Sequence, residues 1–315
     1  MMKRVALLLA ALSWSTSAAA QTAQASQTSQ ALQPSMGIDH LRYTNTVYAQ
    51  MNFRTLAEDL RVRYRPSLYR SEKPLFAMNF VGLMAGATIA PGLFRPTIGV
   101  EVQPLSVFSF GASFEPTYFY NVLGLGQSYP SPTSDFRSGP VKQPKDGPRG
   151  SYSFYAPQVT LYATAQAAVG HLVFRNAFKA TKLLGVDVNE GDRVVYEPSI
   201  DVPVYRNGWW AQNDTDVGVR YDNLVLGLRH TLVVAWYPSG SRPANEVADN
   251  PNTPAGRVGP VLAYTLFANR GGLMDTATIL GVVQWHYVNR YRTGTETSAA
   301  LPLVGAGFTL AGDLL

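Results

Sequence analysis

The chain has 315 residues, a formal net charge of +5, no cysteine, and 15% charged residues. The absence of cysteine excludes a small secreted scaffold held by disulfides. Soluble globular domains carry about 25% charged residues, so this composition favours a membrane protein. However, no apolar run after residue 20 reaches the roughly 20 residues that a membrane helix needs.

The first 38 residues are predicted to lie outside the folded domain. Residues 1–20 have a basic start, an apolar run at 5–12 and small residues ending at Ala20, which is the pattern of a secretory signal peptide. Residues 21–38 are rich in Gln, Ser and Ala, and this composition is typical of a flexible leader. The folded domain is therefore expected over residues 39–315.

Segments that alternate apolar and polar residues follow one another along this domain, and none of comparable length has a helical period. In SVFSFGASFEPTYFY (106–120), Phe108, Phe110 and Phe114 share one phase, whereas Glu115 lies on the other. Segments of about nine or more residues suit tilted membrane-crossing strands, because soluble strands average about five or six. The sequence predicts an all-β chain of twelve strands, with ten to fourteen as the range. The expected strands are 41–53, 56–69, 76–90, 96–104, 106–120, 152–167, 170–180, 193–205, 217–237, 259–269, 274–291 and 302–314.

The connections between these strands predict a consistent orientation. The two longest, 121–151 and 238–258, are rich in Gly, Pro, Ser and charge, so we expect solvated loops on the outer side. Compact turns at 103–106, 169–170 and 269–273 then fall on the inner side. The inner link 206–216 is long enough to contain an extra hairpin. Pro116 and Pro203 fall inside predicted strands, where each removes a ladder hydrogen bond unless a bulge absorbs it.

On these residues the chain resembles bacterial outer-membrane β-barrel proteins as an architectural class. The resemblance rests on the signal 1–20, the alternating strands, and aromatic residues near strand ends. It implies an antiparallel transmembrane β-barrel in the bacterial outer membrane; a soluble β-sandwich or barrel is the alternative. The aromatic residues expected at the two membrane interfaces are Tyr43, Tyr118, Tyr120, Trp209, Trp210, Trp236, Trp285, Tyr287 and Tyr291.

In such a barrel the polar phase lines the lumen. Eight strands leave an interior that side chains fill, and 16–18 leave an open channel, so twelve allow either a narrow pore or a packed core. Arg61, Arg63 and Arg65 form a basic ladder that selects anions, or they pair with lumenal carboxylates in a structural network. The lumenal candidates are Asp59, Arg61, Arg63, Arg65, Glu101, Glu115, Glu197, Asp201, Arg229, His286 and Arg290.

Three functions follow, of which a passive, porin-like channel for small polar or anionic solutes is the first. The second is a plugged barrel that contacts a cell-envelope complex. The third is a lipid hydrolase, for which His230 on the lipid-facing phase is the best candidate base. No serine lies beside it and no G-x-S-x-G motif is present, so a place near the interface or beside a bulge at 221–223 is the other explanation. We expect no enzyme activity, cofactor, metal site or nucleic-acid partner; the expected partners are membrane lipid, small solutes and an envelope protein complex.

Overall fold

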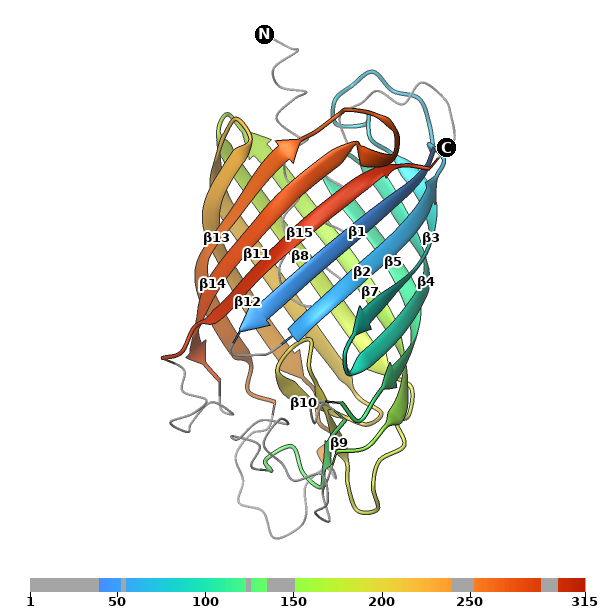
Figure 1. Ribbon diagram of the computed structural model, residues 1–315, viewed down its shortest axis with the longest axis vertical. Helices are drawn as coiled ribbons and strands as arrows, with labels where there is room; N and C mark the ends of the chain where they lie inside the picture. Colours follow the sequence, from blue (N-terminus) through green and yellow to red (C-terminus); the bar gives the residue numbers. More distant parts are fainter. Residues whose placement is uncertain are drawn as a thin grey trace.

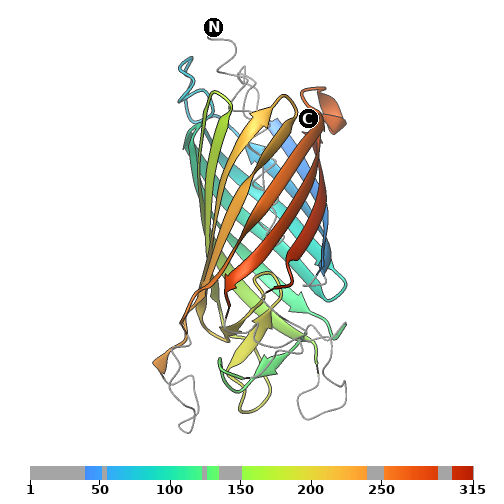
Figure 2. The ribbon, with the colours of Figure 1, turned by 90° about the vertical axis from the view of Figure 1, so that its left-hand side faces the viewer.

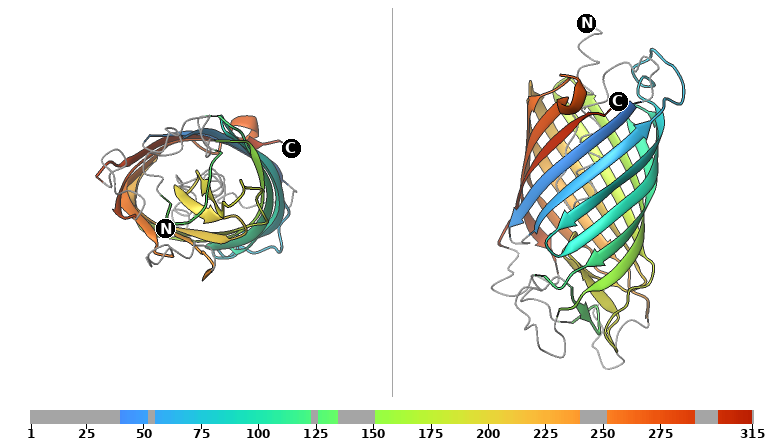
Figure 3. Two further views of the ribbon diagram at one scale, coloured as in Figure 1. Left: turned by 90° about the horizontal axis from the view of Figure 1, so that it is seen from below. Right: turned by 45° about the vertical axis from the view of Figure 1, so that its right-hand side comes forward.

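Twelve antiparallel strands close into a barrel in the computed structural model, which describes residues 40–51, 55–122, 126–134, 151–239, 252–289 and 300–314 (Figures 1 and 3). Around the barrel the order is β1-β15-β14-β13-β12-β11-β8-β7-β5-β4-β3-β2, so β1 pairs with both β2 and β15 and leaves no free edge. The wall strands are β1 (His40–Met51), β2 (Thr55–Arg65), β3 (Phe80–Ala90), β4 (Leu93–Leu105), β5 (Phe108–Phe119), β7 (Phe154–Val169), β8 (Leu172–Leu183), β11 (Trp209–Tyr221), β12 (Leu224–Ala235), β13 (Ala255–Phe267), β14 (Thr276–Val288) and β15 (Leu303–Asp313).

The two ends of the barrel differ. One end, here called the terminal end, carries the start of β1, the end of β15 and the short turns at 106–107, 170–171 and 222–223 (Figures 1 and 2). Gly170 and Asp222 have φ values of 60° and 49°, which tight reversals between paired strands require. The opposite end, here called the mouth, carries the connections from β5 to β7 and from β8 to β11. The compact inner turns expected from the sequence are found at the terminal end.

A second, three-stranded sheet lies in the mouth. It consists of β6 (Ser128–Tyr129), β9 (Val194–Glu197) and β10 (Val202–Tyr205), in the order β10-β9-β6. Viewed along the barrel, β9 and β10 lie within the outline of the wall (Figure 3). We call this sheet the plug. Its β6 comes from the predicted solvated loop 121–151. Residues 121–122 of that loop are exposed as expected, but 126–129 are buried, so the expectation of solvent exposure was wrong for the plug strand.

The plug corrects the predicted strand list. Segment 193–205 was expected to be a wall strand, but it forms the β9–β10 hairpin of the plug instead. The missing wall strand is β11, which runs through the predicted inner link 206–216, and the predicted strand 217–237 is divided by the turn at Asp222. The total of twelve is correct because one strand was misassigned and another was missed. Of the second long loop, 240–251 lies outside the described residues, and β13 already begins at Ala255.

A hydrophobic cluster holds the plug against the inside of the wall. Val194 and Tyr196 of β9 pack with Phe119, Leu183 and Trp210 of the wall strands, and all five are 3% exposed or less. Consecutive residues of β9 are buried because both faces of the strand meet the wall: Val194 and Tyr196 lie on one face, and Glu197 on the other face contacts Arg95 of β4. Trp210 is fully buried here, so its prediction as an interface aromatic was wrong.

Outside the mouth, the predicted phases are confirmed. In β5, Phe108, Phe110 and Phe114 are 38–43% exposed on the outer face, whereas Ser113 and Glu115 are buried in the interior. No helix among the described residues is long and apolar enough to cross a membrane. Tyr291 lies outside the described residues, and Tyr43 is half-buried with its hydroxyl donated to the Leu273 carbonyl. The other predicted interface aromatics, which are exposed, are Tyr118, Tyr120, Trp209, Trp236, Trp285 and Tyr287.

Prolines in the wall stand beside one another. Pro116 of β5 faces Pro157 of β7, and the register between β4 and β5 continues from Phe94–Tyr118 to Ile98–Phe114 with Pro96 and Pro116 opposite each other between them. Since proline has no N–H, this row interrupts the ladder between β4 and β5 without a bulge. Pro203 lies in β10, which pairs only with β9 and is an edge strand of the plug.

Candidate functional site

The basic ladder of β2 exists as predicted, and each arginine faces a carboxylate. Alternation places Asp59, Arg61, Arg63 and Arg65 on the interior face. Arg61 donates from Nε and Nη2 to the two oxygens of Asp59 at 2.6 and 3.2 Å. On the neighbouring wall, Glu101 Oε1 lies 2.6 Å from Arg65 Nε and 3.7 Å from Arg63 Nε. The network of paired charges is therefore present; the selection of anions stays a prediction.

An ion pair connects the wall to the plug. Arg95 of β4 donates from Nη2 to both oxygens of Glu197 of β9, each at 3.2 Å, and from Nε to the Thr117 hydroxyl of β5 at 3.0 Å. Arg95 lies next to the proline row, so its side chain joins β4 to β5 where ladder hydrogen bonds are missing. Glu197 was expected on a wall strand and instead belongs to the plug. Asp201, also predicted for the wall, lies in the β9–β10 turn and accepts the Tyr196 hydroxyl at 2.9 Å.

A buried lysine lies on β8, which is separated from β4 by β7 and β5. Lys179 of β8 is 2% exposed, its Nζ lies 4.7 Å from the Trp210 ring centroid, and Nζ has no hydrogen-bond partner among the described residues. Glu115 holds the predicted interior position, where it accepts Ser113 Oγ and Gln158 Nε2, each at 2.7 Å. Lys179 was not predicted, because the alternation of segment 170–180 is not clean enough to assign its phase.

A second charged group lies on β8, β11 and β12. Arg229 donates from Nε and Nη2 to Asp216 at 2.6 and 2.8 Å, and Arg175 Nη1 is 3.5 Å from the same carboxylate. Asp214 accepts the Thr231 hydroxyl at 2.6 Å. Of these residues only Arg229 was predicted. The two aspartates lie in β11, in the segment that was predicted to be a link, so no interior phase was assigned to them.

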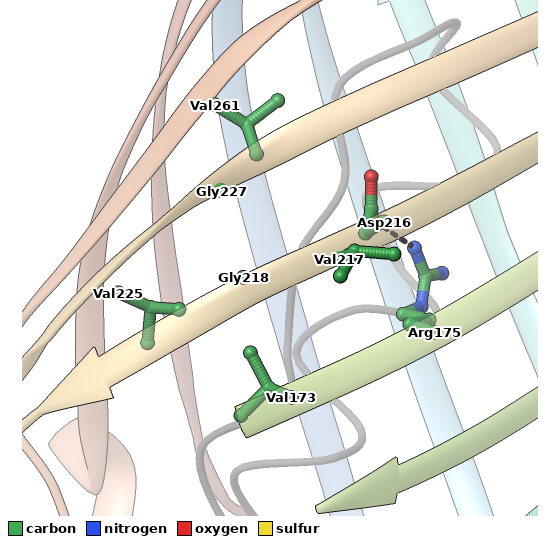
Figure 4. Close-up of a pocket in the computed structure, with 8 residues that line it drawn as sticks. All are labelled: Val173, Arg175, Asp216, Val217, Gly218, Val225, Gly227 and Val261. Atoms are coloured by element: carbon green, nitrogen blue, oxygen red, sulfur yellow. Dashed lines mark hydrogen bonds and ion pairs between the residues drawn. The ribbon is translucent and has the colours of Figure 1, made fainter. Parts of the chain in front are cut away.

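Beside this group the wall contains a small hollow lined by residues of β8, β11, β12 and β13 (Figure 4). Figure 4 shows Arg175 and Asp216 directed toward each other, with Val173 and Val225 along the strands beside them. Gly218 and Gly227 face each other across β11 and β12, and an added Cβ on either would meet backbone of the other strand at 2.6 Å. The hollow therefore forms where two glycines replace side chains and an ion pair borders the space.

The two predicted histidines lie on opposite faces of the wall. His286 of β14 is buried in the interior, as expected, whereas the candidate Arg290 lies outside the described residues. His230 is on the outer face of β12 in continuous register with both neighbours, so the suggested bulge is absent and 222–223 is a turn. Its Nε2 lies 2.7 Å from the Tyr287 hydroxyl, and the two rings stack. Among the described residues no group of three or more His, Cys, Asp or Glu could hold a metal ion.

Buried basic and acidic side chains of the described residues are equal in number. Charges in a low-dielectric interior are stable only when paired and hydrogen-bonded, which explains the dense ion pairing. Among the described residues, eight basic and eight acidic side chains are buried or nearly so. The basic set is Arg61, Arg63, Arg65, Arg95, Arg175, Lys179, Arg229 and Arg257, and the acidic set is Asp59, Glu101, Glu115, Asp192, Glu197, Asp214, Asp216 and Asp275.

Comparisons with known proteins find similar structures only. No family model matches the sequence, and no curated protein matches it significantly. Similar solved structures include the NanC porin (TM-score 0.35, 10% identity, 87% of this chain and 100% of that one). The NalP translocator domain from Neisseria meningitidis has a TM-score of 0.36 and 8% identity, over 89% of this chain and 90% of that one. Omp33 from Acinetobacter baumannii has a TM-score of 0.35 and 9% identity, over 87% of this chain and 99% of that one. These values are too low to transfer a function, so the fold assignment rests on the closed strand pairing of this chain.

Proposed function

We propose that the protein spans the bacterial outer membrane as a channel for small solutes, with a preference for anions. The observation that carries the proposal is a closed barrel with an apolar outer face and a polar interior lined by charged side chains. Apolar side chains such as Ile98 and Leu228 are 62% and 58% exposed, which suits contact with lipid. The preference for anions is proposed from Lys179, a buried interior cation whose Nζ has no hydrogen-bond partner among the described residues, because such a charge favours entry of anions.

The plug supports a second candidate, a closed barrel with a structural role. β9 and β10 lie across the mouth, and the side chains that anchor them are almost without solvent contact: Arg95 is 1% exposed and Glu197 2%. A barrel sealed at this level would conduct only when the plug moves. The two candidates differ in a measurable property, the resting conductance of the inserted protein.

The test is single-channel recording of the refolded full chain in a planar bilayer under a salt gradient. A channel gives steady conductance, and the sign of its reversal potential shows selectivity for anions. Lys179→Gln shifts that reversal potential toward zero because it removes a lumenal cation. Lys182→Gln is the matched control, since Lys182 belongs to the same strand but to the outward phase. A silent bilayer that contains heat-modifiable, inserted protein contradicts the channel and favours the structural role.

A further inference from the structure

The outer face of the wall carries an unexpected polar patch. On β8, β11 and β12, the outward positions Asn176, Thr215 and His230 lie opposite one another in register. In β11, Thr215 lies midway between the outward-facing Trp209 near the mouth and Tyr221 at the terminal end. The patch therefore crosses the middle of the outer apolar belt rather than one of its edges.

Side chains of the patch bind one another. Asn176 Nδ2 donates to Asn213 Oδ1 at 3.0 Å and to Thr215 Oγ1 at 2.8 Å, and Asn213 Nδ2 donates back to Asn176 Oδ1 at 3.1 Å. Tyr287 of β14 reaches His230 across β13, where Gly256 leaves room: an added Cβ there would lie 2.4 Å from the tyrosine hydroxyl. The glycine and the stacked rings show that the contact is built into the wall. We call Asn176, Asn213, Thr215, His230 and Tyr287 the outer polar patch.

Elsewhere the outward positions of the described wall strands are apolar, apart from Lys182 at the mouth end of β8 and one pair on β1 and β2. In that pair Asn45 Nδ2 donates to Glu58 Oε1 at 2.8 Å. The pair lies about half the circumference away from the outer polar patch in the strand order. Polar groups that face hydrocarbon are unfavourable, so a group of them in mid-membrane indicates a surface that lipid does not cover.

We propose that the outer polar patch is the contact surface for a second copy of this chain, related by a two-fold axis near Thr215. Amide, hydroxyl and neutral imidazole groups both donate and accept hydrogen bonds, so the patch is complementary to itself and needs no partner of opposite charge. A two-fold contact brings the same patch together from both subunits. The closed barrel has no free strand edge, so the copies meet through side chains, which hydrogen-bond strongly enough in lipid to hold such contacts.

This inference rests on the proposed membrane location, and the test separates the two. Because the chain has no cysteine, single cysteines can be placed at will. Val217→Cys and Leu228→Cys lie on the outer face beside the patch, at positions 54% and 58% exposed. The controls are Ile98→Cys on the apolar wall and Val47→Cys beside the Asn45–Glu58 pair, 62% and 43% exposed. Each full-length variant is oxidised in membranes and run on a non-reducing gel.

The expected result is a band of twice the monomer mass for the two patch positions and none for the controls. The dimer band disappears when Asn176→Leu, Thr215→Val and His230→Leu are combined with Val217→Cys, while the heat-modifiable barrel persists. Monomer alone in a correctly inserted barrel overturns the inference and leaves the membrane location standing. Equal dimer bands at all positions, or a cross-linked band of another mass, also overturn it. Protein absent from the membrane fraction overturns both proposals.

Discussion

Strands β5 and β9 both lie in segments that the sequence predicted to alternate, but their surroundings differ. β5 exposes Phe110 and Phe114 on the outer face and buries Glu115 in the interior, so each face meets a different environment. In β9 the apolar residues Val194, Val195 and Tyr196 follow one another, and all three are buried in the plug, 3% exposed or less. The comparison teaches that a period of two identifies a strand with two distinct faces but does not tell whether lipid or protein covers the apolar one.

Removing the plug has the largest expected effect. Replacing residues 187–206 with a short Gly-Ser linker deletes β9 and β10, while every wall strand keeps both of its neighbours. We expect a several-fold rise in single-channel conductance, because the sheet no longer lies across the mouth. Retained heat-modifiability on a gel is the control for an intact barrel. An unchanged conductance would show that the constriction is elsewhere.

Breaking the ion pair between Arg95 and Glu197, which connects the plug to the wall, has the next largest expected effect. Glu197→Gln leaves Arg95 buried without its counter-charge, and losing one partner of a buried ion pair costs about 3–5 kcal/mol. The plug then loosens, and recordings show frequent transitions between conductance levels. Replacing both residues with methionine removes the uncompensated charge, so the double variant should be quieter than the single one. If the single variant conducts like the wild type, the ion pair does not hold the plug.

A smaller effect is expected from replacing phenylalanines on the two faces of β5, which compares burial against the plug with exposure on the outer face. Phe119 is 2% exposed and stacks on Phe154 with ring centroids 4.6 Å apart, so Phe119→Ala should lower the free energy of unfolding by about 3 kcal/mol. Phe114 is 38% exposed on the outer face, where lipid or detergent fills the space that alanine leaves. Phe114→Ala should therefore cost clearly less. Urea titration of both variants in the same detergent checks the ranking.

Raising the pH should weaken the plug slightly. Burial, with the charge of Asp192, raises the pKa of the Tyr129 hydroxyl in β6. A raised pKa in the folded state means that protonated Tyr129 supports folding fully below its ordinary value of about 10, and that this support is lost as the pH rises further. Channel transitions should become more frequent above about pH 10. Tyr129→Phe keeps the ring and cannot ionise, so it should remove that pH dependence; an unchanged dependence would assign it to another group.

Part of this architecture could be predicted from the sequence because the information is local. Neighbouring residues decide the alternation, so the phases within 41–51, 56–65, 97–103 and 108–119 are confirmed, while 52–53 lie outside the described residues. Asp59, Arg61, Arg63 and Glu101 lie in the interior as predicted. The turns at the terminal end could likewise be recognised from glycine and from short spacing. Closure into a barrel follows from strand number and length together with an apolar face that needs cover on every strand.

Contacts between residues distant in sequence required the tertiary structure. Glu197 belongs to a plug rather than a wall because Arg95, 102 positions earlier, meets it across the mouth. Trp210 is buried rather than interfacial because the plug packs against it, although its neighbour Trp209 faces outward. The sequence alone determined that the chain forms two-faced strands with charged groups on one face, since side-chain alternation is local. Only the tertiary structure decided which environment covers each face, because burial depends on the elements that pack together in space.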